Sequence, residues 1–168
     1  MLITALLLVF SEFVLSNNME AFIVGGKEVD IHCYSHSAYL TVQIGQIVFA
    51  CGSSILNQNI IITAAHCFEG FDKHSKVSVR AGNSHKMQGS VRNVKRVSIH
   101  NKYDKVTVDN DIALAYFKKP FRLGSQIKRV IVMKDPPKTN VGYLAGWGLI
   151  DVSLFAMYFK CCKYFAFI

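Results

Sequence analysis

The stretch TAAHC, residues 63–67, contains the first candidate for chemistry in this sequence. His66 could act as a general base, because an imidazole titrates near neutral pH. Such a base needs a carboxylate that holds its ring, and Asp111 at the head of DNDIAL, residues 109–114, offers one. Because apolar residues follow Asp111 at once, we expect its carboxylate to lie near the buried side of a strand. From the residues alone this pairing stays open, since any other acid of the chain could be nominated.

The cysteine beside this histidine allows two interpretations. His66 and Cys67 could be a metal-binding pair, but no second ligand pair lies at a suitable spacing. Cys51 is better explained as the disulfide partner of Cys67, and that bridge would fix where the imidazole points. The chain has five cysteines, so at least one thiol lacks a partner within the chain. We expect no metal site and no cofactor.

The elements that would position these residues are predicted to be β-strands. Alternating and short apolar runs indicate strands at 38–44, 46–56, 60–63, 77–81, 94–100, 111–117 and 141–147. Short strands at regular spacing, without a long helical period, favour an all-β barrel or sandwich. A length of 168 residues with 51% hydrophobic and 18% charged residues suits one domain with a buried core.

The N-terminal residues predict that the protein is secreted. Residues 2–10, LITALLLVF, form an apolar run that is too short to span a bilayer and is typical of a signal-peptide core. Residues 14–16 offer a cleavage point, so we expect a signal peptide at 1–16 and a short propeptide at 17–22. Secretion would place the cysteines in an oxidising extracellular environment, where disulfides form.

Four motifs occur in the order in which one known family carries them. They are IVGG, CGSSIL with TAAHC, DNDIAL and AGWG, between residues 23 and 148. Over this range the chain resembles the trypsin/chymotrypsin-like serine endopeptidases. The resemblance implies two packed six-stranded β-barrels with the active site between them. It also implies cleavage of peptide bonds by a Ser-His-Asp triad, with a protein or peptide as substrate.

The resemblance assigns roles to particular residues. It makes His66 the general base, Asp111 its orienter and Asp109 a neighbour of the catalytic acid. It makes Ile23 the N-terminus that zymogen cleavage exposes, although the preceding Phe22 is not the basic residue that a tryptic activator needs.

The nucleophile of the family has no counterpart in these 168 residues. The family carries it in a GDSGGP motif well past GWG. Ser53 and Ser54 lie in CGSSIL, where the family uses them structurally, and Ser153 in DVSLF lacks flanking glycines. A serine nucleophile also needs backbone donors for the oxyanion, and in the family these belong to the same later segment.

The expected fold is therefore all-β, a trypsin-like double barrel in which the first antiparallel barrel is complete and the second is mostly missing. We expect the first barrel at about 23–122, and a connector with the first strand of the second barrel at 123–148. Residues 149–168 are expected to be a divergent apolar tail. This tail is not expected to span a membrane, because charged residues interrupt it: Asp151, Lys160 and Lys163.

Two further sites of the family are not expected in this chain. A loop of the first barrel binds calcium through acidic side chains in some relatives, but residues 81–90 carry no carboxylate. A bridge from Cys33 to Cys161 or Cys162 is disfavoured, because Cys33 does not match the position of the family's N-terminal bridge.

We expect a secreted serine-type endopeptidase by family, whose 168-residue chain is inactive as it stands. The alternative is a non-catalytic secreted homologue that acts as a binding or decoy module. The net charge of +8 could also attract polyanions, but no recognised binding motif accompanies the charge, so we expect no nucleic-acid partner. The specificity pocket is not encoded, and primary specificity, physiological substrate and oligomeric state stay open.

Overall fold

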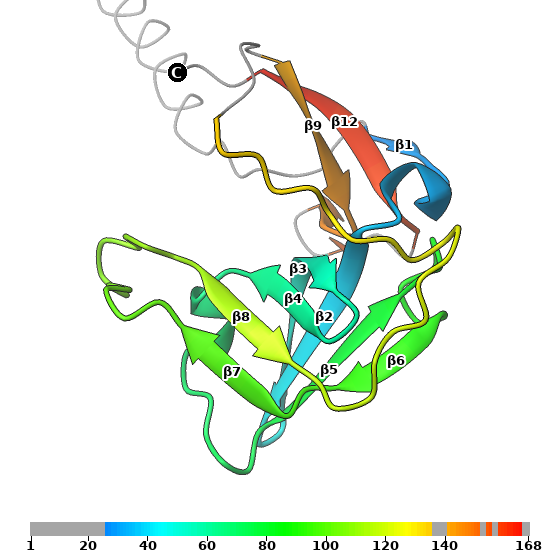
Figure 1. Ribbon diagram of the computed structural model, residues 1–168. Coiled ribbons are helices and arrows are strands. Elements are labelled where there is room, and N and C mark those ends of the chain that lie inside the picture. The colour runs from blue at the N-terminus through cyan, green and yellow to red at the C-terminus, as the bar shows by residue number, and fades with distance from the viewer. Residues whose placement is uncertain (1–25, 136–140, 152–153, 156–157, 166–168) are drawn as a thin grey trace, which may run out of the picture.

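The computed structural model describes residues 26–135, 141–151, 154–155 and 158–165 (Figure 1). Their regular structure consists of β-strands and two short 3-10 helices, so the predicted all-β class is confirmed. Within these ranges no helix has the length and apolar character needed to cross a bilayer.

A seven-stranded antiparallel sheet makes up most of the described chain. Its spatial order is β6-β5-β2-β3-β4-β8-β7. The bounds are β2 Ser37–Ile44, β3 Ile47–Asn57, β4 Ile60–Thr63, β5 Lys76–Ala81, β6 Ser90–Asn93, β7 Arg96–Ile99 and β8 Ala113–Tyr116. β6 and β7 stand at opposite ends of this order, yet only Val94 and Lys95 separate them in sequence. The sheet must therefore curl round until its two edge strands meet, as in a barrel (Figure 1).

The core of this barrel is formed by alternate side chains of the strands, which point to its inside. Ala38, Leu40 and Val42 of β2 are fully buried, while the residues between them are only partly so. They pair with β5, where Leu40 lies opposite the equally buried Val79. Because β-strand side chains alternate between faces, this pattern fixes which face of the sheet lies inside.

The predicted strands match observed strands with small shifts at their ends. β4 has the predicted bounds, and β2 begins one residue earlier than predicted. The strand predicted at 111–117 shortens to Ala113–Tyr116, because Val108 and Asn110 have positive φ angles of 59° and 54° and the chain is still in a loop there. The sequence pattern did not predict β6, whose side chains are mostly exposed.

A second, three-stranded sheet has the order β1-β12-β9. β1 spans Lys27–Glu28, β9 Val141–Gly146 and β12 Lys160–Phe165. A separate pair is formed by β10, Leu149–Asp151, and β11, Leu154–Phe155. β12 is antiparallel to both of its neighbours, with Lys160 opposite Gly146 and Phe165 opposite Val141. Part of the expected divergent tail is thus a regular strand of the fold.

The tryptophan of GWG explains how this part of the chain is held. Trp147 is buried against Phe159, which is fully buried, with 4.6 Å between their ring centroids. Its ring also meets Tyr39 of β2 edge-on at 5.6 Å, and its indole Nε1 donates a hydrogen bond to the Ser84 carbonyl at 2.7 Å. With Ile31 of the 3-10 helix η1, Ile31–Tyr34, these residues form a second small core that joins the two sheets.

Candidate active site

His66 begins the 3-10 helix η2, His66–Phe68, which follows β4 after a two-residue link. The flanking Ala65, Cys67 and Phe68 are all buried and anchor this turn in the barrel core. The imidazole itself points outward, with a side chain that is 55% exposed. A buried turn thus carries an accessible imidazole, the arrangement that a base acting on a substrate requires.

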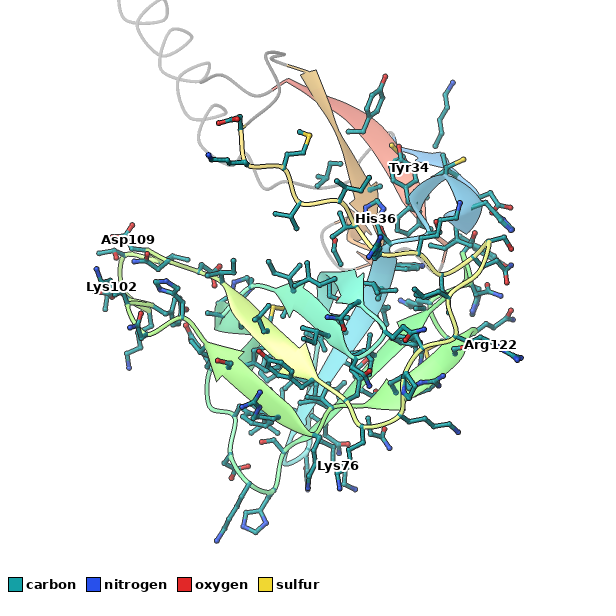
Figure 2. The ribbon with its side chains drawn as sticks, viewed as in Figure 1. Tyr34, His36, Lys76, Lys102, Asp109 and Arg122 are labelled. Atoms are coloured by element: carbon teal, nitrogen blue, oxygen red, sulfur yellow. A yellow bond between two sulfur atoms is a disulfide. The ribbon has the colours of Figure 1, made fainter. Side chains whose placement is uncertain are left out.

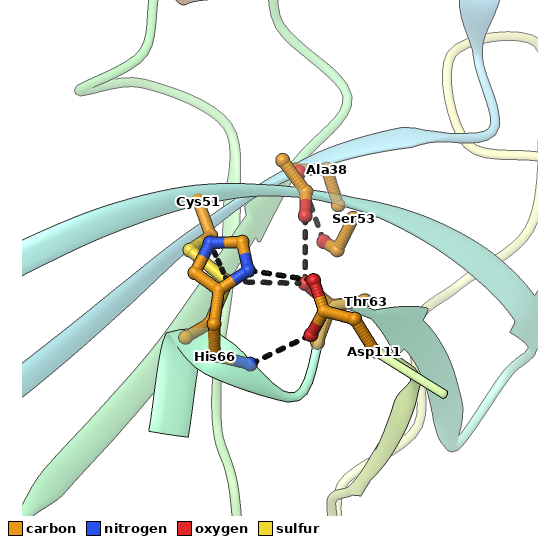
Figure 3. The surroundings of a disulfide bond; sticks show 8 residues. Ala38, Cys51, Ser53, Thr63, His66 and Asp111 are labelled. Atoms are coloured by element: carbon orange, nitrogen blue, oxygen red, sulfur yellow. Dashed lines mark hydrogen bonds and ion pairs between the residues drawn. A yellow bond between two sulfur atoms is a disulfide. The ribbon is translucent and has the colours of Figure 1, made fainter. Parts of the chain in front are cut away.

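The structure joins Cys51 and Cys67 in a disulfide, which ties β3 to η2 directly beside the histidine (Figure 3). Thr63 adds a second tie, because its buried hydroxyl donates a hydrogen bond to the Gly52 carbonyl at 2.8 Å. The disulfide joins β3 to η2, and the hydrogen bond joins β3 to the end of β4. They restrict the backbone on either side of His66 and therefore the place of its ring.

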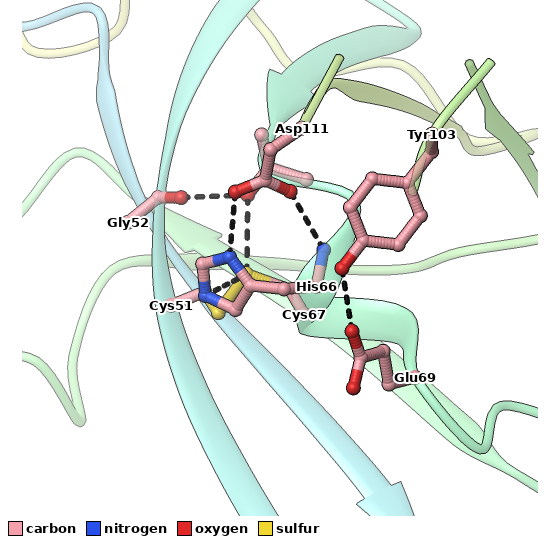
Figure 4. Close-up of polar contacts among 8 residues, drawn as sticks. Cys51, Gly52, His66, Cys67, Glu69, Tyr103 and Asp111 are labelled. Carbon is pink, nitrogen blue, oxygen red and sulfur yellow. Dashed lines mark hydrogen bonds and ion pairs between the residues drawn. A yellow bond between two sulfur atoms is a disulfide. The ribbon is translucent and has the colours of Figure 1, made fainter. Parts of the chain in front are cut away.

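Asp111 contacts His66 through both of its carboxylate oxygens (Figure 4). Oδ1 accepts a hydrogen bond from the backbone N–H of His66 at 2.8 Å, and Oδ2 lies 2.8 Å from the imidazole Nδ1. An ionised carboxylate only accepts hydrogen bonds, so the ring must donate from Nδ1. In the neutral ring, Nε2 then carries the lone pair that can take a proton from another group.

The neighbouring acid does not share this contact. Asp109 turns to its own loop, where its Oδ2 accepts a hydrogen bond from the Thr107 hydroxyl at 2.9 Å. Between the two acids lies Asn110, whose side chain donates to the Lys102 carbonyl at 3.0 Å. The structure therefore brings Asp111, and not Asp109, to His66.

The environment keeps Asp111 ionised. Burial alone would raise the pKa of its carboxyl, but the hydrogen bonds from the ring and the backbone N–H of His66 outweigh burial and lower the pKa below 3.8. The side chain is 21% exposed. The carboxylate can thus stabilise a positive charge on the imidazole throughout the neutral range.

Acid should therefore weaken the fold through this pair. A folded-state pKa below the unfolded value of 3.8 stabilises the fold above that pH, and the stabilisation is lost as the pH falls through the folded-state pKa. We expect the difference in unfolding free energy between wild type and Asp111→Asn to shrink as the pH drops below 3.8. Urea unfolding at a series of pH values measures this difference. A difference that stays constant from neutral pH into acid would contradict the assigned contact.

Sequence reasoning missed a second polar contact beside the histidine. The hydroxyl of Tyr103 donates a hydrogen bond to Glu69, which immediately follows η2 (Figure 4). This bond to a carboxylate raises the pKa of Tyr103 to about 12, so the hydroxyl stays protonated. No local pattern could indicate the pair, because its members come from loops 34 residues apart.

A cavity of about 700 Å³ opens next to His66. Its wall includes Tyr39, the exposed Val48 and Phe49 of β3, the disulfide, and Glu69. An apolar hollow beside an accessible base can take part of a bound chain.

The same cluster does not suit a metal ion. The sulfur atoms of Cys51 and Cys67 and a ring nitrogen of His66 lie within 4.8 Å of one another. Both sulfur atoms are joined in the disulfide, and metal binding needs thiolates. In this described group, only the imidazole is left as a ligand.

The remaining predicted residues lie elsewhere. The hydroxyl of Ser53 donates a hydrogen bond to the Ala38 carbonyl of β2 at 2.9 Å, and not to His66 (Figure 3). Ser54 lies in β3, where it pairs with β2 and β4. Ser153 and Ile23 lie outside the described residues.

The other cysteines lie near the second sheet. Cys33 of η1 is exposed and forms no disulfide. The Sγ of Cys161 in β12 lies 2.8 Å from the hydroxyl of Tyr34, the last residue of η1. The side chain of Cys162 is not among those that the structure describes.

Comparison with known proteins agrees with this geometry. A family model, Trypsin, matches residues 23–155. Hypodermin-B from Hypoderma lineatum is 36% identical over 134 residues, which cover 79% of this chain and 51% of that protein. Trypsin from Sarcophaga bullata is 30% identical over 136 residues, which cover 80% of this chain and 52% of that protein. The chain thus spans about half the length of these curated relatives.

Solved structures show the same fold. An inactivated protease paralogue of the scabies mite, S-D1, superimposes with a TM-score of 0.74 at 25% identity, covering 85% of this chain and 62% of that one. HL collagenase superimposes with the same TM-score at 23% identity, covering 85% of this chain and 63% of that one.

Proposed function

The chain belongs to the trypsin family of serine proteases, and we propose that residues 23–148 are the base-bearing part of a secreted endopeptidase. The observation that carries the proposal is the double contact between Asp111 and His66. The hydrogen bond from the backbone N–H of His66 holds the Asp111 carboxylate in place. The carboxylate then requires the imidazole to carry its proton on Nδ1. The apolar run at residues 2–10 supports secretion.

In the proposed mechanism, Nε2 of His66 takes the proton from a serine hydroxyl as that oxygen attacks the carbonyl carbon of a peptide bond. Asp111 stabilises the imidazolium that forms and keeps the ring in place. The imidazolium then returns the proton to the leaving amine. The cavity of about 700 Å³ beside the ring offers room for a part of the substrate chain.

We expect that the 168-residue polypeptide does not itself hydrolyse peptides, because its sequence lacks the motif that carries the family's nucleophile. In the family, the nucleophile and the oxyanion donors come from the GDSGGP segment, which this sequence does not contain. We expect no turnover of fluorogenic peptides above the blank and no covalent adduct with a fluorophosphonate probe. Mass spectrometry of the treated chain measures the adduct, with trypsin as the positive control. An adduct at Ser53, or at any other serine, would overturn this part of the proposal.

A second candidate function is a non-catalytic binding or decoy module. One of the solved structures that the chain resembles is described as an inactivated protease paralogue, at 25% identity. The accessible cavity, with Val48 and Phe49 exposed at its wall, supports peptide binding without cleavage. The measurement that separates the candidates is fluorescence anisotropy of a labelled peptide. Saturable binding that Phe49→Ser weakens, without turnover, favours the decoy.

A further inference from the structure

Two cavities at one end of the first sheet share part of their walls. The larger, about 610 Å³, lies where the loop before β5 meets the start of β7, and the smaller, about 440 Å³, lies along β5 and β6. Ser75 and Val94 line both cavities, so the two are adjacent and are taken together as one groove. We call it the cationic groove, after the basic residues along it: Lys73, Lys76, Lys95 and Arg96.

The positive charge of the cationic groove is not neutralised. Asp72 is the only acidic residue that lines it. Its Oδ1 accepts hydrogen bonds from the Ser75 hydroxyl at 2.7 Å, the Ser75 N–H at 2.9 Å and the His74 N–H at 3.0 Å, which hold it in its own turn. Within the described ranges, the ion pairs join histidines to aspartates and involve none of the four basic residues. The groove therefore presents a surplus of exposed cations to solvent.

The backbone that carries these cations is held in place. Arg96 lies opposite Tyr116 of β8, and its guanidinium lies over the Tyr116 ring, 4.2 Å from the centroid. The N–H of Lys95 donates a hydrogen bond to the Tyr116 carbonyl at 2.6 Å. Lys76 lies in β5, opposite Gln43 of β2. Lys76 and Arg96 lie in strands and the backbone of Lys95 is hydrogen-bonded to β8, so less conformational entropy is lost when an anion binds.

We propose that the cationic groove binds a linear sulfated polysaccharide. Sulfate groups pair with lysine and arginine, and the hydroxyls of the sugar find neutral partners in the smaller cavity, which Thr41, Gln43, Ser78 and Asn93 line. A single-stranded nucleic acid would need open aromatic rings for base stacking. Among the residues that line the groove, Phe71 is the one aromatic ring, and a strand of bases needs several such rings to stack on.

The cationic groove is separate from the candidate active site. None of the residues that line it lines the cavity beside His66. Lys76 lies at the end of the sheet far from Tyr34 and His36, and well away from Lys102 and Arg122 (Figure 2). The proposal therefore goes beyond the proposed peptidase function and does not depend on it.

Heparin binding by the full chain tests the proposal. Replacing all four groove cations by serine should weaken the affinity for a heparin dodecasaccharide about 30-fold at physiological salt, because four exposed ionic contacts are lost. The slope of log Kd against log salt should fall as well. The matched control removes the same charges from other surfaces: Lys102→Ser, Lys105→Ser, Lys128→Ser and Arg129→Ser.

Each outcome of these measurements either supports or overturns the proposal. Loss of affinity in the groove variant alone supports it, whereas equal loss in both variants shows a general charge effect and overturns it. Duplex DNA that binds as tightly as heparin, with the same dependence on the groove, would overturn the assigned ligand. Lysine acetylation of the wild-type chain avoids any folding defect of a variant: heparin should protect Lys73, Lys76 and Lys95, and equal labelling with and without heparin would refute the site.

Discussion

An asparagine at position 111 should abolish nearly all activity in a chimera that completes the active site. In this chimera, residues 23–148 are followed by the segment after GWG from a complete trypsin-like relative, and Ile23 is freed by an engineered cleavage site. We expect the chimera to cleave peptides and Asp111→Asn to lower its kcat about 10⁴-fold, a magnitude known for this change in serine proteases rather than derived from this structure.

The geometry gives the reason for the loss. The His66 N–H donates to Oδ1 at 2.8 Å, so an asparagine would turn its carbonyl oxygen to that N–H and its NH₂ group to the ring. The ring would then accept at Nδ1 and carry its proton on Nε2, where it cannot act as a base. His66→Ala, which removes the base itself, should cost about 10⁶-fold in kcat.

Asp109→Asn is the matched control for the chimera. It makes the same chemical change two residues away, on a side chain that contacts Thr107 and not His66. Its kcat should stay close to that of the parent chimera. If Asp109→Asn lost as much activity as Asp111→Asn, or if the Asp111 variant kept its kcat, the assignment of Asp111 as orienter would be wrong.

Removing the disulfide should have the largest effect on stability. The bond between Cys51 and Cys67 closes a loop with a sequence separation of 16, and its loss should lower the free energy of unfolding by about 3 kcal/mol. The double change Cys51→Ser with Cys67→Ser tests this by urea unfolding of the full chain. η2 is tied to β3 through this bridge, so we also expect faster amide hydrogen exchange at His66 and Phe68.

Cys33→Ser is the control for the disulfide. Cys33 is exposed and forms no disulfide, so its replacement should change the free energy of unfolding by less than about 0.5 kcal/mol. A double variant within about 1 kcal/mol of wild type would show that the bridge does little to hold η2, since a loop of this size should contribute about three times as much.

The strands around the site were predictable because each carries a local pattern. β4 is a run of isoleucines between turns, and β2 alternates, so burial and strand propensity agree in both. β6 was not predicted because its sequence, SVRN, has no alternating apolar pattern. It lies at the edge of the sheet, and its side chains are mostly exposed. η1 and η2 are too short for a helical period to appear.

Pairings between distant residues were the harder part. From residue types alone, Asp111 was one acid among several, and only the ordered motifs singled it out. Local sequence patterns do not indicate the hydrogen bond between Tyr103 and Glu69 or the packing of Phe159 against Trp147. Each contact depends on how segments far apart in the sequence come together. The apolar composition after Gly148 suggested a segment foreign to the fold, because strand register cannot be read from composition.

The pairing of β1 with β12 has a consequence for how the chain is made. Lys27 lies opposite Cys161, so one of the first described strands leaves the ribosome long before its partner exists. All seven strands of the curled sheet lie between residues 37 and 116 and can assemble while later residues are still being translated. The curled sheet can thus form first, whereas β1 cannot pair before β12 has been synthesised. The order of synthesis therefore makes the pairing of β1 with β12 a late step of folding.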